Sequence, residues 1–583
     1  MVTWLLALTI GLPWLGALCV WAAGNKHPRA QHGLAAAFSV VAGLAALALL
    51  PFTSDTAALS IPVGGIFGDF TLTPDGLGVF LAIIANVVGS LAVIFSIDYM
   101  HGEAELGRYY ALVLFFIGAM AGLVLCGSLL FMFIFWEITA FCSYALISFH
   151  NDDPKAVAGG IKALIVTQLG GVGLLAGALV IYGYLGSYQI TDFLAQANTL
   201  PPGLLGVIAF GSIVAAAAKS AQVPLHTWLP DAMEAPTPVS ALIHAATMVN
   251  AGVYLLARFY PAFAEVTGWT TAAILVGLLS ALLSAMMALV TDDIKRCLAY
   301  STISQLGYMV YAVGVGALFA SQFHLLSHAV FKALLFLGAG AVIHTVGTRD
   351  MRQMGGLGHS MPFVRMVFII GGLALAGLPI TNGFFSKETI LEGGLGHGPR
   401  WAYIGMLIGA GLTGLYTVRM VSMVFFGEAN PRQRAHDAPP AMRISLSLLA
   451  IGTLTTWLLA GPFSRLLAGS LPFHDLHPES SLAITTEIIT ATATWLALVV
   501  IGLGLATWLL RDRLAGLRRR LSPVASFAAD GFGFEWLNQQ IVRLMTATSA
   551  LISKSQTGHL NWNMAGIAGA LIVVLIILAW SVQ

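Results

Sequence analysis

Charged side chains are scarce in this sequence of 583 residues. Only 9% of the residues are Asp, Glu, Lys or Arg, whereas 58% are hydrophobic, and the mean hydropathy is +0.86. A soluble globular domain carries roughly a quarter charged residues. The composition therefore excludes a water-soluble fold, and the long apolar runs predict an all-α polytopic membrane protein.

Cysteines and cofactor-binding motifs are scarce as well. The four cysteines lie singly within or beside apolar runs, without a CxxC pair, at Cys19, Cys126, Cys142 and Cys297. This spacing argues against iron–sulfur clusters, structural zinc and a disulfide framework in this chain. No GxxxxGK[ST] loop occurs, and no strand context gives a glycine pattern the meaning of a dinucleotide site. We therefore expect that any redox cofactors belong to partner subunits.

The apolar runs are long enough to cross a bilayer, which takes about 20 residues per helix. They predict about sixteen transmembrane helices, which places both termini on one side. Residues 1–23 lack a basic leader and a cleavage site of small residues, so the first helix is expected to remain in place. The predicted spans are 3–23, 33–51, 76–98, 109–127, 128–148, 160–184, 204–224, 234–258, 270–290, 296–316, 323–345, 362–386, 402–427, 442–468, 488–510 and 563–582.

Basic residues gather in the loops that follow odd-numbered spans. By the positive-inside rule these loops face the cytoplasm, so both termini are predicted to be periplasmic in a bacterial inner membrane. Loops after even-numbered spans offer little beyond Arg258 and Arg400. The basic loop residues are Lys26, Arg29, Arg108, Lys155, Lys295, Arg296, Arg349, Arg352, Arg432, Arg434, Arg518, Arg519 and Arg520.

The stretch 511–562 is too polar to span a membrane. It nevertheless repeats apolar residues at helical spacing opposite polar ones, which predicts an amphipathic helix lying along the membrane surface. A solvated loop with incidental periodicity is the alternative. The apolar positions are Phe534, Leu537, Ile541, Leu544 and Leu551, and the polar ones are Glu535, Asn538 and Arg543.

Two predicted spans combine a lysine with a helix breaker. Lys219 is followed by Pro224 and Pro230, and Pro379 lies eight residues before Lys387. Proline interrupts helices, and broken helices at matching places in two halves are typical of inverted repeats around a central ion path. We therefore expect such repeats here.

Several charges lie inside apolar spans, where each costs on the order of 3 kcal/mol or more. Glu137 lies in the middle of the fifth span, in FIFWEIT, and Lys219 lies deep in the seventh. Opposite charges in neighbouring helices suggest a pair in which the charge on Lys219 responds to proton transfer. The alternative is a fixed salt bridge that locks two helices.

Histidines add titratable groups to two further spans. His244 lies in the eighth span and is either a proton carrier or a hydrogen-bonded core histidine. His324, His328 and Lys332 repeat every four residues in the eleventh span, so they stack on one helical face about 6 Å apart. Three titratable groups in a line predict a proton relay.

Lys387 and Glu388 follow the broken twelfth span and are a candidate outlet near the outer face, or a snorkelling pair at a helix end. The charged loop from Thr291 to Arg296 is expected to be solvated, although Asp293 or Lys295 is a possible inlet.

One long motif resembles a known family. The run from Lys219 to Tyr254, KSAQVPLHTWLPDAMEAPTPVSALIHAATMVNAGVY, looks like the antiporter-like subunits of respiratory complex I and of Mrp cation/proton antiporters. LAYSTISQLGY at 298–308, FHLLSHAVFKALLF at 323–336 and GFFSKE at 383–388 support this resemblance. It extends over roughly residues 80–583.

The resemblance implies two inverted five-helix repeats, each with a broken helix, and a proton path along a central hydrophilic axis. It also implies proton-carrier roles for Glu137, Lys219, His244, His324, His328, Lys332 and Lys387. The expected segments are N-terminal helices at 1–108, repeats at 109–258 and 270–427, further helices at 442–510, a lateral segment at 511–562 and an anchoring helix at 563–583. The last two resemble the distal complex I subunit.

Some residues depart from the distal complex I pattern. That subunit usually carries an arginine and an aspartate in the sixth span, whereas this chain reads VTQLGGV at 166–172, closer to the large Mrp subunit. The segments around Glu234 and 347–350 also resemble the Mrp and membrane-hydrogenase side. The chain stops at Gln583 without the extra C-terminal domain of the large Mrp subunit, and its lateral segment is short.

Three functions remain open on the sequence. The leading hypothesis is the proton-translocating subunit of a complex I-type NADH:quinone oxidoreductase or an Mrp-like assembly, with flavin, iron–sulfur clusters and quinone on partner subunits. The second is a membrane subunit of an inorganic-carbon accumulating complex with a zinc partner. The third is a structural scaffold with static ion pairs. Lysines and histidines suit protons better than sodium, which prefers oxygen ligands.

Overall fold

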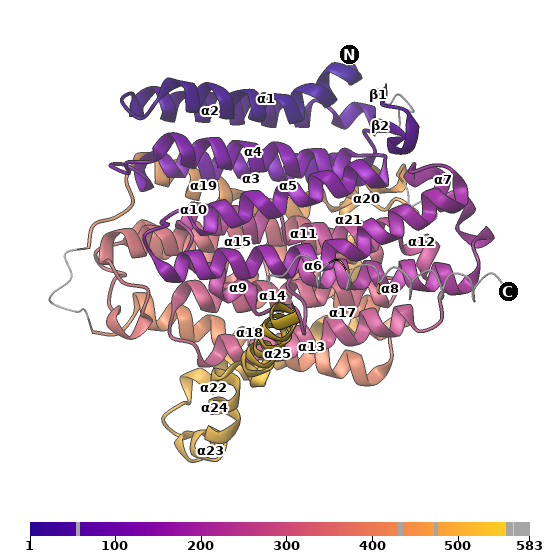
Figure 1. Ribbon diagram of the computed structural model, residues 1–583. Coiled ribbons are helices and arrows are strands. Elements are labelled where there is room, and N and C mark those ends of the chain that lie inside the picture. The colour runs from indigo at the N-terminus through magenta and orange to yellow at the C-terminus, as the bar shows by residue number, and fades with distance from the viewer. Residues whose placement is uncertain (54–58, 429–434, 471–475, 556–563, 565–568, 570–583) are drawn as a thin grey trace. The chain divides into compact units, whose positions relative to one another are not determined.

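The computed structural model describes residues 1–53, 59–428, 435–470, 476–555, 564 and 569. These residues form two compact units, 1–525 and 526–583. The first unit holds the spans and the buried charges, and Figure 1 shows that its long helices run side by side.

Thirteen helices or helix pairs within the described residues are long and apolar enough to cross a membrane, as expected of a polytopic all-α membrane protein. They are α1 (Val2–Ala23), α2 (Pro28–Leu47), α3 (Gly76–Tyr99), α4 (Leu106–Leu125), α5 (Leu129–Ile147), α6 (Pro154–Leu185), α8 (Pro202–Lys219), α10–α11 (Thr237–Ala241 and Asn250–Arg258), α13 (Trp269–Val290), α15 (Leu318–Val346), α18 (Arg400–Phe425), α19–α20 (Pro440–Thr455 and Ala460–Ala468) and α22 (Thr492–Leu509).

The other three predicted spans differ from this pattern. The helix α14 (Ile294–Gly314) has 21 residues, enough to cross, but its buried serines, threonine and glutamine lower its hydropathy. The predicted span 362–386 is divided into α16 (Pro362–Ala376) and α17 (Asn382–His397), each too short alone. The predicted span 563–582 lies outside the described residues except for positions 564 and 569.

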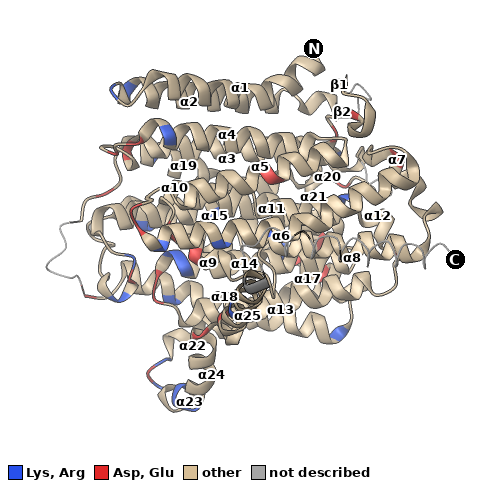
Figure 2. Ribbon diagram, in the orientation of Figure 1, with Lys and Arg blue, Asp and Glu red and all other residues tan. Residues whose placement is uncertain are grey.

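The helices of the first unit define two ends. Loops 24–27, 100–105, 148–153, 291–293 and 347–361 meet at one end, which we call the basic end because most Lys and Arg positions lie there (Figure 2). Loops 186–201, 259–268, 315–317 and 476–480 lie at the opposite end, together with the short helices α7 (Ile190–Gln196), α12 (Tyr260–Phe263) and α21 (Ser481–Thr490).

A small antiparallel hairpin at the opposite end was not expected from the sequence. Strands β1 (Leu59–Pro62) and β2 (Asp69–Leu72) pair with Leu59 opposite Leu72, and Leu72 also bridges to Cys126. Gly64, Gly65 and Gly68 supply the positive φ angles of the connection. A strand of four residues is too short to show a clear alternating pattern, so it escapes a search for apolar runs.

Helix α14 packs closely against α13, and this contact determines which way the polar face of α14 points. Side chains added at Gly277 of α13 or Gly307 of α14 would meet the backbone of the facing helix. Small residues at such a crossing let two membrane helices approach closely. The opposite side of α14 contacts α15, where Gln305 faces His324 and Ser301 faces Lys332.

Both predicted helix breaks are present. Helix α8 ends at Lys219, and an irregular segment leads to α9 (Trp228–Asp231), with Ala221 at φ +49°. Between α16 and α17, Gly377 and Ile380 adopt φ +81° and +74°. The inverted relation of segments 109–258 and 270–427, and the other segment boundaries, stay predictions.

The C-terminal part contains the helices α23 (Ala515–Arg520), α24 (Ser522–Ala529) and α25 (Phe534–Ser555). The predicted amphipathic periodicity falls within α25, whose Leu537, Ile541, Leu544 and Leu551 are exposed. An exposed apolar face on a helix is typical of a surface that packs against lipid or protein. The position of α25 along the membrane surface stays a prediction.

Candidate functional site

Lys219 is the last residue of α8 and is fully buried. Its Nζ donates a hydrogen bond of 2.7 Å to the carbonyl oxygen of Trp136 in α5, and it lies 4.9 Å from the centroid of that indole ring. The carboxyl-terminal end of a helix carries a partial negative charge, which favours a cation there. The helix break and the tryptophan thus hold an ammonium group inside the bundle.

Glu137 follows Trp136 directly, but it points toward α6. Its side chain is half-buried beside Gln168, and its Oε1 packs so closely on Gly171 that a Cβ at that position would overlap it. Within the described residues, Glu137 and Lys219 are electrostatic neighbours without a direct hydrogen bond. The expected Glu–Lys pair therefore interacts through charge without a direct contact, and the Trp136 carbonyl oxygen accepts the hydrogen bond from Lys219.

His244 lies in a π-helical segment, Leu242–Ala246, between α10 and α11. It is fully buried and stacks on Phe336 of α15 at 4.9 Å between ring centroids. Neither ring nitrogen has a hydrogen-bonding partner among the described residues. A π-bulge is a frequent mark of a functional position, and buried polar atoms of this kind usually bind ordered water.

Helix α15 carries the predicted row of three titratable groups, all fully buried. The rings of His324 and His328 lie 6.4 Å apart, and Lys332 Nζ donates a hydrogen bond of 2.7 Å to Ser301 Oγ of α14. Both ring nitrogens of His328 lack a partner within the described protein. The spacing of one helical turn is therefore realised as a buried polar row.

Two polar side chains that the sequence did not single out fix His324. Its Nδ1 lies 2.9 Å from Ser386 Oγ in α17, and its Nε2 lies 3.1 Å from Gln305 Oε1 in α14. Because glutamine Oε1 only accepts, Nε2 carries the proton in the neutral ring, and Nδ1 faces the Ser386 hydroxyl, which also lies 2.9 Å from the carbonyl oxygen of Asn382. Ser301, Gln305 and Tyr308 recur at i, i+4 and i+7, a polar stripe that marks this face of α14.

Lys387 lies in the first turns of α17, immediately after the second helix break. Its Nζ donates a hydrogen bond of 2.9 Å to the carbonyl oxygen of Leu375 in the last turn of α16, and it lies 5.6 Å from the ring centroid of Tyr308. The arrangement resembles that of Lys219, because the ammonium group of Lys387 also lies at the carboxyl-terminal end of a helix, here α16, and near an aromatic ring. Lys387 is fully buried, which excludes snorkelling to the surface.

Glu388 is also fully buried, and neither carboxylate oxygen has a hydrogen-bonding partner in the described part of the chain. An unpaired buried carboxylate is costly, so water or a proton must stabilise it. Glu388 and Lys387 are electrostatic neighbours, which joins the carboxyl group to the buried row.

These groups form one electrostatically connected row. Lys332 is a neighbour of His244, His328, His324 and Lys387 in turn, and Lys387 is a neighbour of Glu388. Glu137 and Lys219 form a separate cluster in the first half. The structure thus divides the eight predicted residues into a pair and a row of six.

The basic end is held by ion pairs, contrary to the expectation of a solvated loop at 291–296. Asp293 caps α14 and lies 3.3 Å from Arg349, which also contacts Glu234 at 3.0 Å. Lys295 is 3% exposed, and its Nζ donates to the carbonyl oxygen of Ala235. Other pairs join Asp231 to Lys162 and Arg296, and Asp292 to Arg352 and Arg419.

The loop at 347–353 adds a further charged contact at this end. Hydrogen bonds from the Arg352 side chain to Asp350 hold the pKa of that carboxyl below its usual range. The carboxyl therefore stays ionised and keeps its bond to Arg352 at neutral pH.

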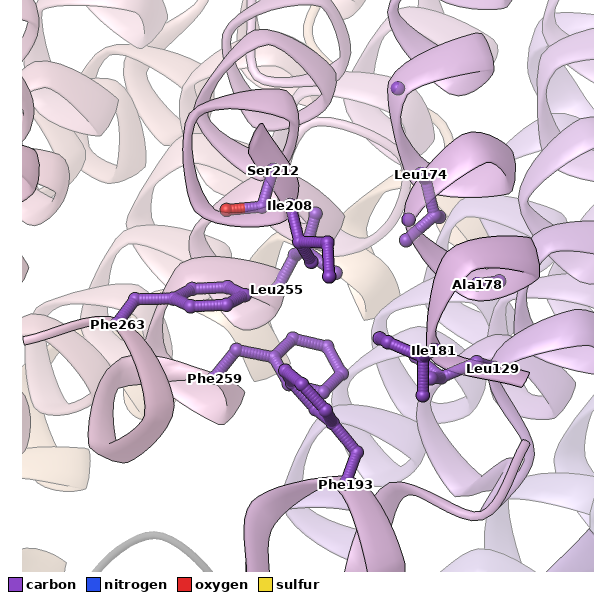
Figure 3. Close-up of a pocket in the computed structure, with 12 residues that line it drawn as sticks. Leu129, Leu174, Ala178, Ile181, Phe193, Ile208, Ser212, Leu255, Phe259 and Phe263 are labelled. Atoms are coloured by element: carbon purple, nitrogen blue, oxygen red, sulfur yellow. The ribbon is translucent and has the colours of Figure 1, made fainter. Parts of the chain in front are cut away.

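A small apolar cavity lies on the other side of Lys219, at the opposite end (Figure 3). Its volume is about 20 Å³, and Phe193, Phe259 and Phe263 line it together with Leu174, Ile208 and Ser212. None of its twelve lining residues is titratable. The first half of the bundle therefore has an apolar cavity at the end opposite the basic loops.

No group of three or more His, Cys, Asp or Glu side chains suited to a metal ion occurs in the described ranges. The buried lysines and histidines instead present nitrogen groups that exchange protons.

Comparison with known proteins identifies the family. Residues 126–413 match the family described as NADH:quinone oxidoreductase/Mrp antiporter, TM, a range that contains all eight predicted residues. Residues 61–110 match the family described as NADH-ubiquinone oxidoreductase (complex I), chain 5 N-terminus.

The chain is 34% identical to NADH-quinone oxidoreductase subunit L of Escherichia coli (strain K12), over 98% of this chain and 99% of that protein. It is 33% identical to Na(+)/H(+) antiporter subunit A1 of Staphylococcus haemolyticus, over 88% of this chain and 67% of that subunit.

Among solved structures, the Mrp complex from Dietzia sp. DQ12-45-1b matches with a TM-score of 0.84 at 28% identity, over 100% of this chain and 63% of that one. The archaeal membrane-bound sulfane sulfur reductase matches with a TM-score of 0.72 at 26% identity, over 83% of this chain and 99% of that one. The chain belongs to the family of antiporter-like, proton-translocating membrane subunits shared by NADH:quinone oxidoreductases and Mrp antiporters.

Proposed function

We propose that this chain moves protons through the bilayer along the row formed by His244, Lys332, His328, His324, Lys387 and Glu388. The observation that carries the proposal is the row itself, in which every member is fully buried and each is an electrostatic neighbour of the next. Six titratable groups in an apolar interior cost free energy, and such groups in membrane proteins usually mark an ion or proton path.

The hydrogen bonds support a distinct part for each group in this path. Lys332 donates to Ser301 and Lys387 donates to Leu375, so each lysine has a fixed acceptor when it is protonated. His324 is held between Ser386 and Gln305, whereas His328 and His244 have no partner among the described side chains and are suited to exchange protons with water.

The Glu137–Lys219 pair controls the charge of the first half. Ionised Glu137 favours the protonated form of Lys219, and protonation of Glu137 removes that support. The Trp136 carbonyl keeps the ammonium group in place while this happens. Protons are the favoured ion because only carboxylates among these groups offer oxygen ligands to a metal cation.

We propose a complex I-type NADH:quinone oxidoreductase as the host, with flavin, iron–sulfur clusters and quinone on partner subunits. The match to subunit L, 34% identical over 99% of that relative, supports this host. An Mrp-type host is the second candidate, supported by the structural match of 0.84. In either host we propose that the basic end faces the cytoplasm.

Proton transport by the purified complex in vesicles tests the path. Replacement of Lys332 by Met keeps an unbranched side chain and removes the charge, and we expect a loss of about 100-fold or more, as for a missing proton-transfer group. Lys155→Met is the control, because Lys155 is exposed at the basic end.

Assembly is checked by native electrophoresis before transport is compared. If the Lys332 variant assembles and transports protons at the normal rate, the charges are static and the chain acts as a scaffold.

Purification of the intact complex in mild detergent tests the host. Co-purifying flavin and iron–sulfur subunits with NADH:quinone activity support the complex I-type assignment. Only small hydrophobic partners would transfer the chain to an Mrp-type antiporter, and a zinc protein would transfer it to an inorganic-carbon system.

A further inference from the structure

A second cavity, much larger than the apolar one, opens at the end of the bundle opposite the basic loops. Its volume is about 860 Å³, whereas a single water needs roughly 10–15 Å³. It lies between the turn from α14 to α15, the end of α17, and α21. Carboxylates on its wall make it suitable for water.

Three glutamates and two histidines line this cavity, which we call the acidic cavity: Glu392 and His397 on α17, Glu487 on α21, and His477 and Glu479 just before α21. The exposure of the glutamate side chains to solvent increases from Glu392 to Glu487 and Glu479. Glu392 is half-buried, and Glu487 and Glu479 are exposed. Each is an electrostatic neighbour of the next, from Glu392 to Glu487 and from Glu487 to Glu479. The cavity thus carries a series of carboxylates from the half-buried side of α17 to the protein surface.

The inner end of this series meets the buried row. Glu388 lies one helical turn before Glu392 on α17, and residues four apart in a helix lie on the same face about 5–6 Å apart. The two carboxylates are electrostatic neighbours, and both oxygens of Glu388 lack partners among the described residues. Thr389, between them, lines the cavity.

We propose that the acidic cavity is the aqueous mouth of the proton path, in which Glu392 and Glu487 pass protons between Glu388 and bulk water. This inference rests on the proposed function, because it extends the row from Glu388 to the surface.

The proton balance is simple. The O–H bond of protonated Glu388 breaks and the proton passes through water to a carboxylate oxygen of Glu392. Lys387 then returns a proton to Glu388 and becomes neutral. Glu392 releases its proton to water or to Glu487, so no charge accumulates in the cavity wall.

The apolar cavity beside α8 serves as an internal reference. It lies at the same end of the bundle, since Phe259 lines it while Tyr260 lines the acidic cavity. An apolar cavity of this size stays dry, whereas a large one with carboxylates fills with water. The proposal therefore predicts water access on the α17 side and none on the α8 side.

Transport in vesicles tests the two glutamates. We expect Glu392→Gln to lower proton transport by about tenfold, less than the 10²–10⁴-fold effect of a typical acid–base group, because water bypasses one missing carboxylate. Glu487→Gln should have a smaller effect, and Glu392→Asp should restore transport. Glu103→Gln, at the exposed basic end, is the matched control.

Lys332→Met is measured in the same preparation, so that two failures are distinguishable. If Lys332→Met abolishes transport and Glu392→Gln leaves it unchanged, the mouth is elsewhere and the proposed path stands. If Lys332→Met retains transport, the proposed function fails and this inference fails with it.

Labelling with a small, charged thiol reagent tests water access directly in the complete complex. Thr389→Cys should be modified, and Ser212→Cys in the apolar cavity should not, as measured by the mass of this chain. The native Cys126, Cys142 and Cys297 are buried, and the half-buried Cys19 is replaced by Ser in every variant to keep the background low. An unmodified Thr389→Cys, or equal modification of both variants, would overturn the proposal.

Discussion

The two halves of the molecule place a lysine in the same way but end differently. In each half the lysine donates to a backbone carbonyl and lies beside an aromatic ring at a helix break. Beyond Lys219 lies an apolar cavity of about 20 Å³, and beyond Lys387 lies an acidic one of about 860 Å³. A lysine that is held in a similar way is therefore followed by an apolar cavity in one half and by an acidic cavity in the other.

The difference follows from the side chains that surround each lysine. Phe193, Phe259 and Phe263 exclude water near α8, because apolar walls offer no hydrogen bonds. Around α17, Glu392 and Glu487 offer carboxylates to water. Protons move through water and titratable groups, so the route that we propose to this end lies in the second half of the described chain.

The largest expected effect is at Lys387. Replacing it by Ala removes the group that connects the row on α15 to Glu388, and we expect proton transport to fall by about 100-fold or more. The measurement is proton uptake by vesicles that contain the assembled complex. Lys26→Ala, at an exposed position of the basic end, is the control. Normal transport by the Lys387 variant would break the comparison, since the outlet would then bypass α17.

A bulky side chain in the acidic cavity should have the next largest effect. Gly396 lines the cavity, and a Cβ there meets no heavy atom within 4 Å, so a tryptophan has room to enter it. We expect Gly396→Trp to displace water and to lower transport by roughly tenfold, a smaller loss than that of an acid–base group.

Gly203 provides a matched control for this substitution. It lies at the start of α8, also has open space around an added Cβ, and lines neither cavity. Equal losses in Gly203→Trp and Gly396→Trp would show that the tryptophan disturbs the fold rather than the water.

Much of the fold follows from the sequence because a bilayer imposes apolar runs of a fixed length. This rule locates thirteen spans among the described residues, but it treats α14 as an ordinary apolar helix and α16 and α17 as one. The polar residues of α14 are tolerated because they are buried in protein rather than exposed to lipid. Burial of this kind depends on tertiary packing, which one sequence does not display.

The types of the site residues were predictable, since a charge inside an apolar run is conspicuous. Their partners were not. Lys219 bonds to a carbonyl of α5, and Lys387 bonds to a carbonyl of α16, and every residue has such an oxygen. The acidic cavity joins Glu392 to Glu487, which are 95 positions apart in the chain, so no local pattern connects them.

The basic end should respond in stability more than in transport. Arg349 contacts Glu234, Asp293 and the carbonyl oxygen of Met233. Replacing it by Ala leaves two carboxylates without this partner, and we expect a loss of about 1–3 kcal/mol in the free energy of unfolding. Thermal unfolding of the purified complex measures this change, and Arg400→Ala, at an exposed position of the other end, is the control. Equal melting temperatures would show that the ion pairs add nothing.

The smallest effect is expected at Ser212, on the wall of the apolar cavity. Its hydroxyl donates to the carbonyl oxygen of Ala209 in its own helix, and that contact adds little to helix stability. Ser212→Ala should therefore leave proton transport in vesicles within about twofold of normal, since a hydroxyl in a dry cavity takes no part in proton transfer. A severalfold loss would mean that water reaches Ser212. Both halves would then have a hydrated outlet at this end, and the two outlets would differ only in size.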